Sequence, residues 1–203
     1  ATTELALKLS AERKKISREF ALKVKEEMTY LDMPNVNLEV SIERCPLNEN
    51  GCDKLEFLIS ANPGEAPKPV SKIASGGELS RMMLAITNVI ASHNIVSTMI
   101  FDEVDTGISG SASQKVGYKL KALSETRQVI CITHQAQIAA LADTHFLIKK
   151  NVENNRTFTQ VSELSFEDRV RELARIIGGV SITELTLIHA EEMLLQSKNK
   201  NEI

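Results

Sequence analysis

Three short segments of this chain carry residue types that suit chemistry on a phosphate group. In the first, Ser75, Gly76, Gly77 and Glu78 stand together at the expected start of a helix. The two glycines let backbone N–H groups approach an anion, the helix N-terminus adds partial positive charge, and the Ser75 hydroxyl adds a donor. The structural alternative is a helix capping box, because Ser75 and Glu78 have its S-x-x-E spacing.

The second segment, 98–103, is an apolar strand that ends in two acids. A carboxylate at the C-terminal end of a strand can hold Mg²⁺ through its water shell. A second carboxylate beside it can orient and deprotonate an attacking water. On this interpretation Asp102 serves the metal and Glu103 is the general base. The alternative is a strand that simply runs into a polar turn.

The third segment is a strand, 129–133, followed directly by His134. A histidine there could hydrogen-bond the γ-phosphate of a nucleotide and sense its loss, whereas the structural alternative is a helix-capping or buried histidine. His93, His145 and His189 have no comparable context. The three segments follow one another as a phosphate turn, an acidic strand end and a strand ending in histidine, with helices between them. That order favours one nucleotide site over three unrelated features.

One part of such a site is absent from the sequence. No G-x-x-x-x-G-K-[ST] phosphate loop occurs, and no glycine is followed by lysine. The sequence therefore predicts only part of an ATP-driven motor. Because Ala1 is not an initiator methionine, we expect the chain to be a piece of something longer.

Composition is that of an ordinary globular protein, with 42% hydrophobic and 25% charged residues. No apolar run approaches the ~20 residues of a membrane helix, and the charged N-terminus does not have the pattern of a secretory signal. The net charge of −3 gives no overall attraction to nucleic acid, so DNA contact would need a local patch or the missing part. For Cys45, Cys52 and Cys131 we expect reduced thiols, with Cys131 in the core; a disulfide or zinc pair of Cys45 and Cys52 is the alternative.

Residues 3–31 predict one long helix with a narrow apolar stripe. The stripe suits either the end of a coiled coil or an amphipathic helix packed on its own domain, and the pattern alone leaves both open. The stripe consists of Leu5, Leu9, Ile16, Phe20 and Val24.

After Pro34 the pattern becomes that of an α/β protein. Strands at 36–42 and 55–61 flank an Asn50-Gly51 turn and predict an antiparallel hairpin, followed by a loop at 63–69. Short apolar strands then alternate with helices, which predicts a largely parallel sheet covered on both faces and closed by the last two strands. The predicted helices are 77–93, 111–124, 135–141, 166–177 and 182–197, and the predicted strands are 97–101, 128–133, 144–149 and 157–161.

Together these segments resemble the ATP site of the ABC ATPases. Residues 74–78 resemble the ABC signature, with Ala74 in place of the usual leucine, and residues 99–103 resemble the Walker B strand. Asp105 matches the D-loop aspartate, which belongs to the nucleotide site of that family, and His134 matches the switch histidine. A long helix leading into this half-domain resembles the SMC and Rad50 branch, where a coiled coil separates the two halves of the ATPase.

Within that branch, the chain resembles the RecN family of bacterial DNA repair proteins. The D-loop extension, 101–110, is the most specific segment, because SMC proteins usually continue differently there, with Ala-Leu-Asp. The resemblance covers essentially the whole chain, as the C-terminal part of such a protein. Further matching segments are 171–175, Gly178-Gly179 and 189–193.

The resemblance implies an α/β fold of the P-loop NTPase class, of the ABC or SMC-head type. Its C-terminal half-domain would hold a mostly parallel sheet with flanking helices and an antiparallel hairpin. Residues 1–31 would form the root of the coiled coil, and residues 32–203 the C-terminal lobe of the head. ATP and Mg²⁺ would be the cofactors, with ATP on the Walker A loop of one head and against Ser75, Gly76 and Gly77 of another.

The same resemblance implies an ATPase that acts in recombinational repair of DNA double-strand breaks, in the cytoplasm and on the nucleoid. Its partners would be the N-terminal half with the Walker A loop, a second head in an ATP-sandwiched homodimer, and DNA, with no membrane. Without Walker A, this chain alone is expected to be inactive.

Three other functions compete with this one. A transporter ATPase subunit is disfavoured by the coiled-coil-like helix ahead of the hairpin. A Rad50-type partner of a nuclease would carry a Cys-x-x-Cys hook at the coiled-coil tip, a segment that is not present in this sequence. A nucleotide-binding or DNA-binding scaffold without turnover is disfavoured by the intact Glu103.

Overall fold

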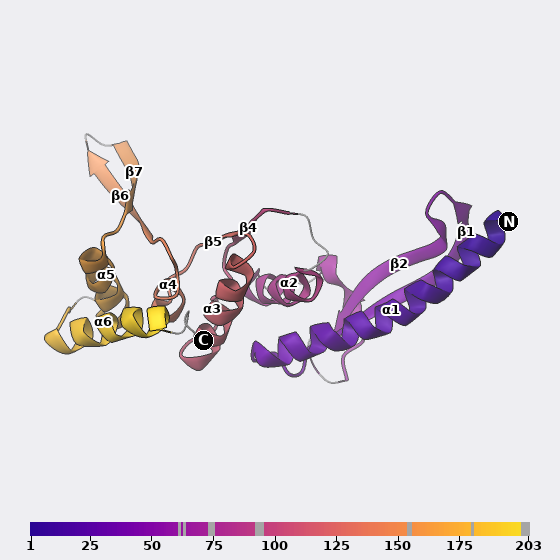
Figure 1. Cartoon of the computed structure of the whole chain (residues 1–203), viewed down its shortest axis with the longest axis horizontal. Coiled ribbons are helices and arrows are strands. Elements are labelled where there is room, and N and C mark those ends of the chain that lie inside the picture. The colour runs from indigo at the N-terminus through magenta and orange to yellow at the C-terminus, as the bar shows by residue number, and fades with distance from the viewer. Residues whose placement is uncertain are drawn as a thin grey trace.

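The polypeptide runs along an elongated molecule, with its first helix at one end and its last two helices at the other (Figure 1). Helices, a parallel sheet and an antiparallel hairpin follow one another, which confirms the predicted α/β class. This computed structural model describes residues 1–60, 62, 64–72, 76–91, 96–153, 156–179 and 181–199.

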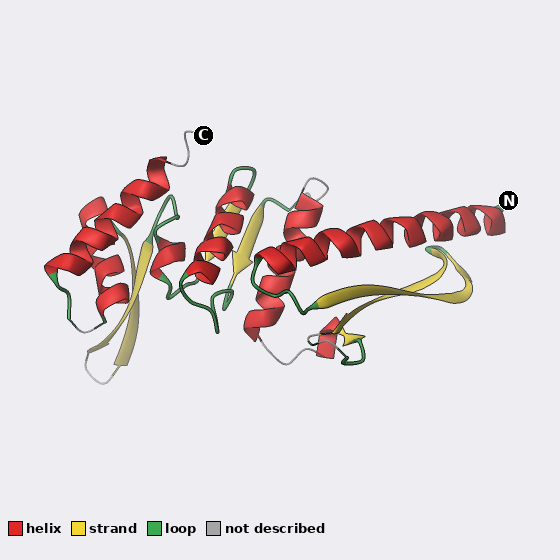
Figure 2. Cartoon of the chain, turned by 90° about the horizontal axis from the view of Figure 1, so that it is seen from below, coloured by secondary structure: helices red, strands yellow, loops and turns green. Residues whose placement is uncertain are grey.

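The first element, α1 (Thr2–Tyr30), lies along the hairpin that follows it (Figure 2). Its N-terminal part leaves Leu5 and Ile16 exposed, at 66% and 58%. Its C-terminal part enters the core, where Phe20 is partly buried and Val24 is fully buried. The end of α1 therefore packs on its own domain, as one alternative predicted, and the start of its apolar stripe is open; whether that start enters a coiled coil stays a prediction.

The hairpin consists of β1 (Asn37–Asn48) and β2 (Gly51–Ser60), paired antiparallel as predicted. Gly51 has a φ of +102°, a left-handed conformation that favours glycine at the end of the turn. A third strand, β3 (Lys68–Pro69), pairs with β2. The predicted loop at 63–69 is therefore wrong at its last two residues, because proline is tolerated at the edge of a sheet.

The centre of the molecule alternates helices with two parallel strands. Its strands, β4 and β5, pair directly with one another. The elements, whose positions agree with the predictions to within a few residues, are α2 (Gly76–Ile90), β4 (Thr98–Phe101), α3 (Ser111–Ser124), β5 (Gln128–Cys131) and α4 (Ala136–Ala139).

One face of this parallel sheet packs against the core and the other is open. Met99, Phe101 and Val129 contact the core, whereas Ile100 and Ile130 are 68% and 44% exposed. A sheet covered on both faces is therefore wrong for the residues described here. Alternate residues of a strand point to opposite faces, so the apolar pattern on both faces predicted a cover that this part of the chain does not supply.

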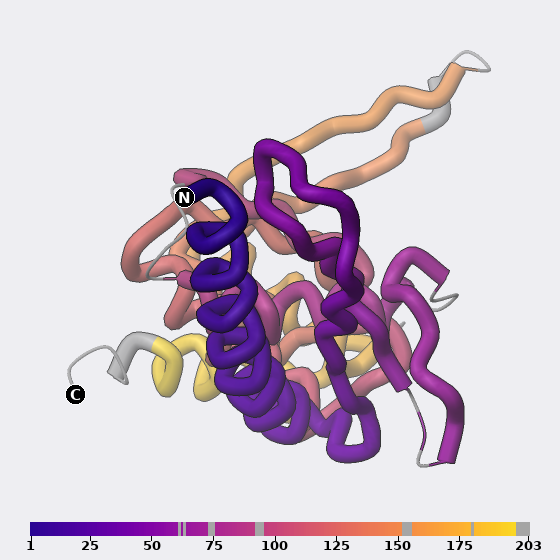
Figure 3. Tube along the Cα trace, turned by 90° about the vertical axis from the view of Figure 1, so that its right-hand side faces the viewer, coloured from indigo at the N-terminus to yellow at the C-terminus, as the bar shows by residue number. Residues whose placement is uncertain are grey.

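The last two strands do not close that sheet. β6 (Phe146–Glu153) and β7 (Arg156–Glu163) pair with each other as a separate antiparallel hairpin. The hairpin projects from the body of the molecule (Figure 3), and apolar side chains such as Phe146, Ile148 and Val161 are more than half exposed. The prediction that these strands complete the parallel sheet is wrong for the described residues, because alternation identifies a strand but not its partner.

Two groups of buried apolar side chains support these elements. The larger group joins the end of α1, the hairpin, α2, β4 and α3, and includes Met28, Leu38, Met82, Phe101 and Val116. The smaller group joins α4 to α5 (Phe166–Gly178) and α6 (Glu184–Asn199), and includes Ala139, Leu173, Ala190 and Leu194.

The helix α3 is also fastened to the end of α1 by charged side chains. Lys119 Nζ lies 2.7 Å from the Glu27 carboxylate and 4.8 Å from the centre of the Tyr30 ring. Lys115, one turn earlier, lies 2.7 Å from Asp32 and 5.9 Å from the same ring. Cation–π contacts of this kind add to the ion pairs, so two lysines of α3 link this helix to the end of α1.

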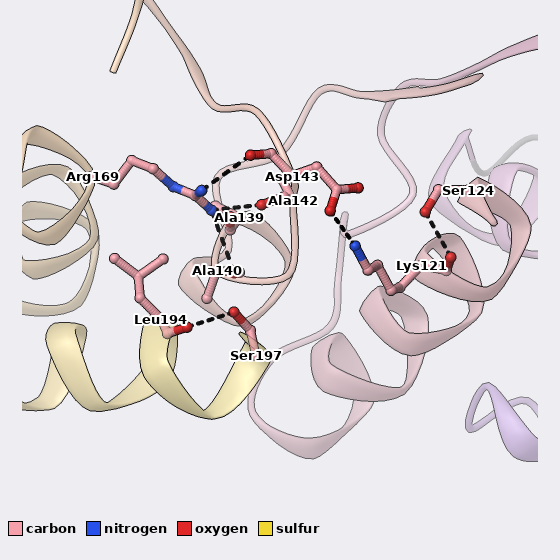
Figure 4. A network of polar contacts seen from close by, with 9 residues as sticks. All are labelled: Lys121, Ser124, Ala139, Ala140, Ala142, Asp143, Arg169, Leu194 and Ser197. Atoms are coloured by element: carbon pink, nitrogen blue, oxygen red, sulfur yellow. Dashed lines mark hydrogen bonds and ion pairs between the residues drawn. The ribbon is translucent and has the colours of Figure 1, made fainter. Parts of the chain in front are cut away.

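Arg169 of α5 donates hydrogen bonds to carbonyl groups at the end of α4 (Figure 4). Its Nη2 donates to the carbonyl oxygens of Ala142 at 2.7 Å and Ala139 at 3.4 Å, and its Nη1 donates to that of Asp143 at 3.4 Å. The Asp143 side chain pairs in turn with Lys121 of α3. A positive charge on these carbonyls satisfies groups that a short helix leaves unpaired.

We expect Arg169→Ala to lower the free energy of unfolding by about 2–3 kcal/mol, because it removes charge-assisted bonds to several carbonyls at once. The measurement is urea unfolding followed by circular dichroism. Arg171→Ala on the same helix is the control: its side chain is 72% exposed and makes one ion pair, so it should change stability by less than about 0.5 kcal/mol. Equal losses in the two variants would contradict the role given to Arg169.

Candidate functional site

A tight turn, 102–106, leaves the C-terminal end of β4. The Thr106 N–H donates to the Glu103 carbonyl at 3.1 Å and closes the turn. Glu103 has a φ of +58°, which costs a non-glycine residue about 1–3 kcal/mol and persists where the surrounding contacts enforce it. Asp102 and Glu103 are both exposed, so the two carboxylates assigned from the sequence are accessible together.

The start of α2 packs directly on this turn. A Cβ atom at Gly76 would overlap the Glu103 carboxylate, and a Cβ atom at Gly77 would lie 2.7 Å from the Thr106 carbonyl oxygen. The overlap at Gly77 is with backbone and requires glycine, whereas a Cβ atom at Gly76 would displace the end of the Glu103 side chain. The Ser80 hydroxyl, one turn along α2, donates to the Asp102 carbonyl at 2.8 Å. The glycine turn and the acidic strand end are therefore in contact within one chain.

The structure describes only one of the two polar residues in the glycine segment. Ser75 lies outside the described residues, so the choice between a phosphate donor and a capping box stays open there. Glu78 lies in the first turn of α2 and is exposed, where an acid is favoured by the helix dipole.

Asp105 joins the turn to the end of β5. Its carboxylate accepts hydrogen bonds from the Thr133 hydroxyl at 2.5 Å and the His134 backbone N–H at 2.9 Å. The Nδ1 atom of His134 lies 3.2 Å from the same oxygen. The Asp105 side chain is 2% exposed, whereas that of His134 is 70% exposed. Asp105 is thus a buried anchor, and His134 presents its ring to the surface.

Gln135 holds the remainder of the loop. Its Nε2 donates to the Ile108 carbonyl at 3.1 Å, and its backbone N–H donates to Thr133 Oγ1 at 3.0 Å. Gly107 and Gly110 have φ values of +76° and +56°, so the loop between Asp105 and α3 follows a path that favours glycine. The three segments identified from the sequence meet through this loop.

The end of β5 lies in a negative electrostatic environment. Burial, followed by the charges of Asp105 and Asp102, raises the pKa of the Cys131 thiol to about 12. Cys131 packs against the core, and the three cysteines are free thiols, as predicted. Burial opposes any charge at this thiol, so a metal would be held by the carboxylates themselves: carboxylate oxygen is the donor type that Mg²⁺ prefers.

Asp102 fits a magnesium ion as one ligand among several. Within the described residues, no group of three or more His, Cys, Asp or Glu side chains is arranged to hold a metal. Because Mg²⁺ commonly keeps waters and binds one or two carboxylates with substrate phosphates, a single exposed Asp102 is compatible with it. The remaining ligands would come from nucleotide and water.

Three residues that position the site escaped the sequence analysis, namely Ser80, Arg81 and Gln135. Arg81 is 6% exposed and donates from Nη1 to the Thr106 carbonyl at 2.7 Å. Burial lowers the pKa of its guanidinium, against the opposing charge of Glu78. The signal was helical spacing: Ser80 and Arg81 stand four residues after Gly76 and Gly77, and therefore on the same helix face.

We expect Asp105→Asn to destabilise the chain by about 1–3 kcal/mol, because an amide keeps the shape but places a donor beside other donors. The measurement is the free energy of unfolding in urea, with hydrogen exchange at the His134 amide as the local probe. Glu125→Gln, at an exposed position just after α3, is the control. Wild-type stability and wild-type protection at His134 would contradict the anchoring role.

Comparisons with known proteins place these observations in context. The sequence matches no family model. It is 44% identical over 187 residues to the DNA repair protein RecN of Halalkalibacterium halodurans, covering 90% of this chain and 33% of that protein. It is 50% identical over 151 residues to RecN of Bacillus subtilis, covering 74% of this chain and 26% of that protein. The chain thus spans about a third of the length of these relatives, in their C-terminal part.

Solved structures agree on the fold. An Smc head domain with a coiled coil and joint from Pyrococcus yayanosii has a TM-score of 0.55 at 23% identity, covering 84% of this chain and 32% of that one. An SmcHead bound to the C-winged helix domain of ScpA has a TM-score of 0.51 at 23% identity, covering 79% and 48%. Every helix in the described ranges is too short or too polar to cross a lipid bilayer.

The fold predicted from the sequence, an α/β half-head of the SMC type, is confirmed by these neighbours. By sequence, the chain corresponds to the C-terminal part of the DNA repair protein RecN.

Proposed function

We propose that this chain is the C-terminal lobe of an SMC-like ATPase head that acts in recombinational repair of DNA double-strand breaks. The observation that carries the proposal is the turn at 102–106. It touches Gly76 and Gly77 at the start of α2 on one side and holds His134 at the end of β5 on the other. Three segments far apart in sequence thus share one surface, in the order that an ATP site requires.

Each exposed group on that surface has a separate task in the proposed reaction. Asp102 holds Mg²⁺, which neutralises charge on the phosphates. Glu103 takes a proton from the attacking water, and His134 donates a hydrogen bond to the γ-phosphate. Asp105 is buried, so we assign it the orientation of His134 and not a direct contact with ATP. Ser75, Gly76, Gly77 and Glu78 form the surface that contacts ATP bound by a second head.

The first partner is an N-terminal half that carries the Walker A loop. The open face of the β4–β5 sheet supports this assignment, because Ile100, Ile130 and Ile132 are exposed there at 68%, 44% and 49%. A continuous apolar face of a sheet is normally covered. Relatives about three times as long as this chain have the additional sequence to cover it.

The exposed start of α1 supports a coiled-coil partner for the first part of this helix, whereas its end packs on the lobe. Leu5 and Ile16 leave the apolar stripe open, as a coiled-coil partner helix would require. We therefore propose residues 1–31 as the coiled-coil root and residues 32–203 as the lobe. A second copy of the head would complete the ATP sandwich. The dimer would bind DNA on the nucleoid, in the cytoplasm, and ATP hydrolysis would change how it holds that DNA.

We expect Glu103→Gln, in the protein that includes the N-terminal half, to keep ATP binding and lower turnover by about 10²–10⁴-fold, because the amide cannot accept the proton of water. The measurement is steady-state phosphate release, with nucleotide binding measured in parallel. Glu125→Gln, at the far end of α3, is the control and should turn over at the wild-type rate.

The same assay tests the split of the site. Turnover by this chain mixed with its N-terminal half, but by neither alone, supports the proposal. Turnover by this chain alone that depends on Glu103 would contradict it. A folded complex of both halves that binds ATP without turnover would favour the scaffold alternative.

A further prediction concerns the second head. Ser75→Arg should leave ATP binding by its own head intact and abolish ATP-dependent dimerisation, because a long cation would fill the space for the facing nucleotide. Light scattering with and without ATP measures this. Ser71→Arg, at an exposed position in the preceding 3-10 helix (Val70–Lys72), controls for added charge. ATP-dependent dimers formed normally by Ser75→Arg would rule out the sandwich.

A further inference from the structure

The guanidinium of Arg81 lies where the start of α2 meets the turn at 102–106. Its Nη1 donates to the Thr106 carbonyl at 2.7 Å, and the Thr106 N–H donates to the Glu103 carbonyl at 3.1 Å. Two hydrogen bonds in series therefore run from α2 to the backbone of Glu103. These hydrogen bonds lie within one head. Their α2 end would contact the nucleotide of the second head, and their Glu103 end would act on the head's own nucleotide.

We infer that Arg81 is a positioning residue of the ATP site: it holds Glu103 of its own head in place through Thr106, and so couples the surface that contacts the second head's nucleotide to the hydrolysis of the head's own. The inference rests on the proposed function, since it presupposes two ATP molecules between two heads.

Burying the charged side chain of Arg81 costs free energy that packing alone would not recover. It is 6% exposed, and its Nε has no hydrogen-bond partner in the described part of the chain. A buried charge with unsatisfied donors destabilises a fold relative to an apolar side chain of similar volume. Methionine has an unbranched apolar stem like that of arginine, so it is the apolar side chain closest in shape to the one it would replace. The bond to the Thr106 carbonyl is the hydrogen bond that the buried guanidinium makes within the described residues, and the charge of Glu78 adds to its stabilisation.

The two glycines at the start of α2 pack closely against the same hydrogen-bonded residues. A Cβ atom at Gly77 would lie 2.7 Å from Thr106 O and 3.3 Å from Arg81 Nη1, directly beside the hydrogen bond that joins them. A Cβ atom at Gly76 would overlap the Glu103 carboxylate. Of the residues that would contact a facing phosphate, Gly76 thus lies against the general base of its own head, and Gly77 lies against the Arg81–Thr106 bond.

The conformation of Glu103 explains why it needs such support. Its φ of +58° is unfavourable for glutamate, so the turn relaxes unless contacts hold it. When a phosphate fixes the N-terminus of α2, the helix carries Arg81 as a rigid body, and the Thr106 carbonyl is held with it. Loss of the guanidinium frees the turn and misplaces the Glu103 carboxylate, while the head's own ATP stays on the Walker A loop.

The test uses the full-length protein with Arg81→Met, Arg81→Lys and Arg127→Met. For Arg81→Met we expect kcat to fall by about 10²-fold, the loss typical of a catalytic group misplaced by about 1 Å, with little change in KM for ATP. Lysine can still reach one carbonyl, so Arg81→Lys should recover part of the loss. Arg127 is the matched control, because it is half-buried, donates to the Ala91 carbonyl at 2.6 Å and also has an unpartnered nitrogen.

Mixed dimers distinguish two possible roles of Arg81. It either positions Glu103 of its own head or acts only on the nucleotide of the second head. In one dimer, a head with Arg81→Met faces a head with Glu103→Gln; in the other, one head carries both changes and its partner is wild type. The reference is a dimer with Glu103→Gln in one head only. We expect turnover to be lost in the first dimer, where the surviving base is unsupported, and to match the reference in the second.

Three results would overturn the inference. They are wild-type kcat in Arg81→Met, an equal loss of kcat in Arg127→Met, and loss of turnover confined to the second mixed dimer. If Arg81→Met fails to fold, Arg81→Lys with normal stability decides by the same mixed dimers. Failure of the proposed function is distinct, because Glu103→Gln would then turn over normally whatever Arg81 does.

Discussion

The buried carboxylate of Asp105 is the contact on which the geometry of the site depends. A hydroxyl, a backbone N–H and an imidazole nitrogen converge on one of its oxygens, within 3.2 Å. A carboxylate removed from water is tolerated only when it is well hydrogen-bonded, so Thr133 and His134 cannot move away without a large loss of free energy. Asp105 thereby fixes the end of β5 relative to the turn that carries Glu103, although these segments are joined by the whole of α3.

The fold separates what the lobe provides for itself from what it leaves open. The end of α1, the hairpin, α2 and α3 enclose a group of fully buried side chains such as Met28, Met82 and Val116. The parallel sheet is different, because its core face contributes Phe101 to that group while Ile100 stays 68% exposed. One strand thus contributes one face to the core and leaves its other face exposed.

Local sequence signals predicted the helices and strands well. Contacts between residues distant in sequence could not be predicted from such signals. Pro34 and Gly51 marked the helix end and the hairpin turn because each imposes its own backbone preference. The order of the glycine turn, Glu103 and His134 predicted a shared site because parallel strands end at one edge. The separate β6–β7 hairpin and the burial of Asp105 depend on partners distant in sequence. Arg81 was missed because a polar residue on an amphipathic helix usually faces solvent.

The groups assigned to chemistry are exposed, and those that position them are buried. Glu103 and Asp102 are exposed and His134 is 70% exposed, while Asp105 and Arg81 are 2% and 6% exposed. A surface of this kind cannot by itself exclude water, and electrostatic stabilisation of a phosphoryl transition state is weak in water. The arrangement therefore suits a site that becomes complete when a second surface closes over it. Buried anchors allow the exposed groups to keep their geometry until that closure, so in the proposed ATPase assembly would switch hydrolysis on without rebuilding the lobe.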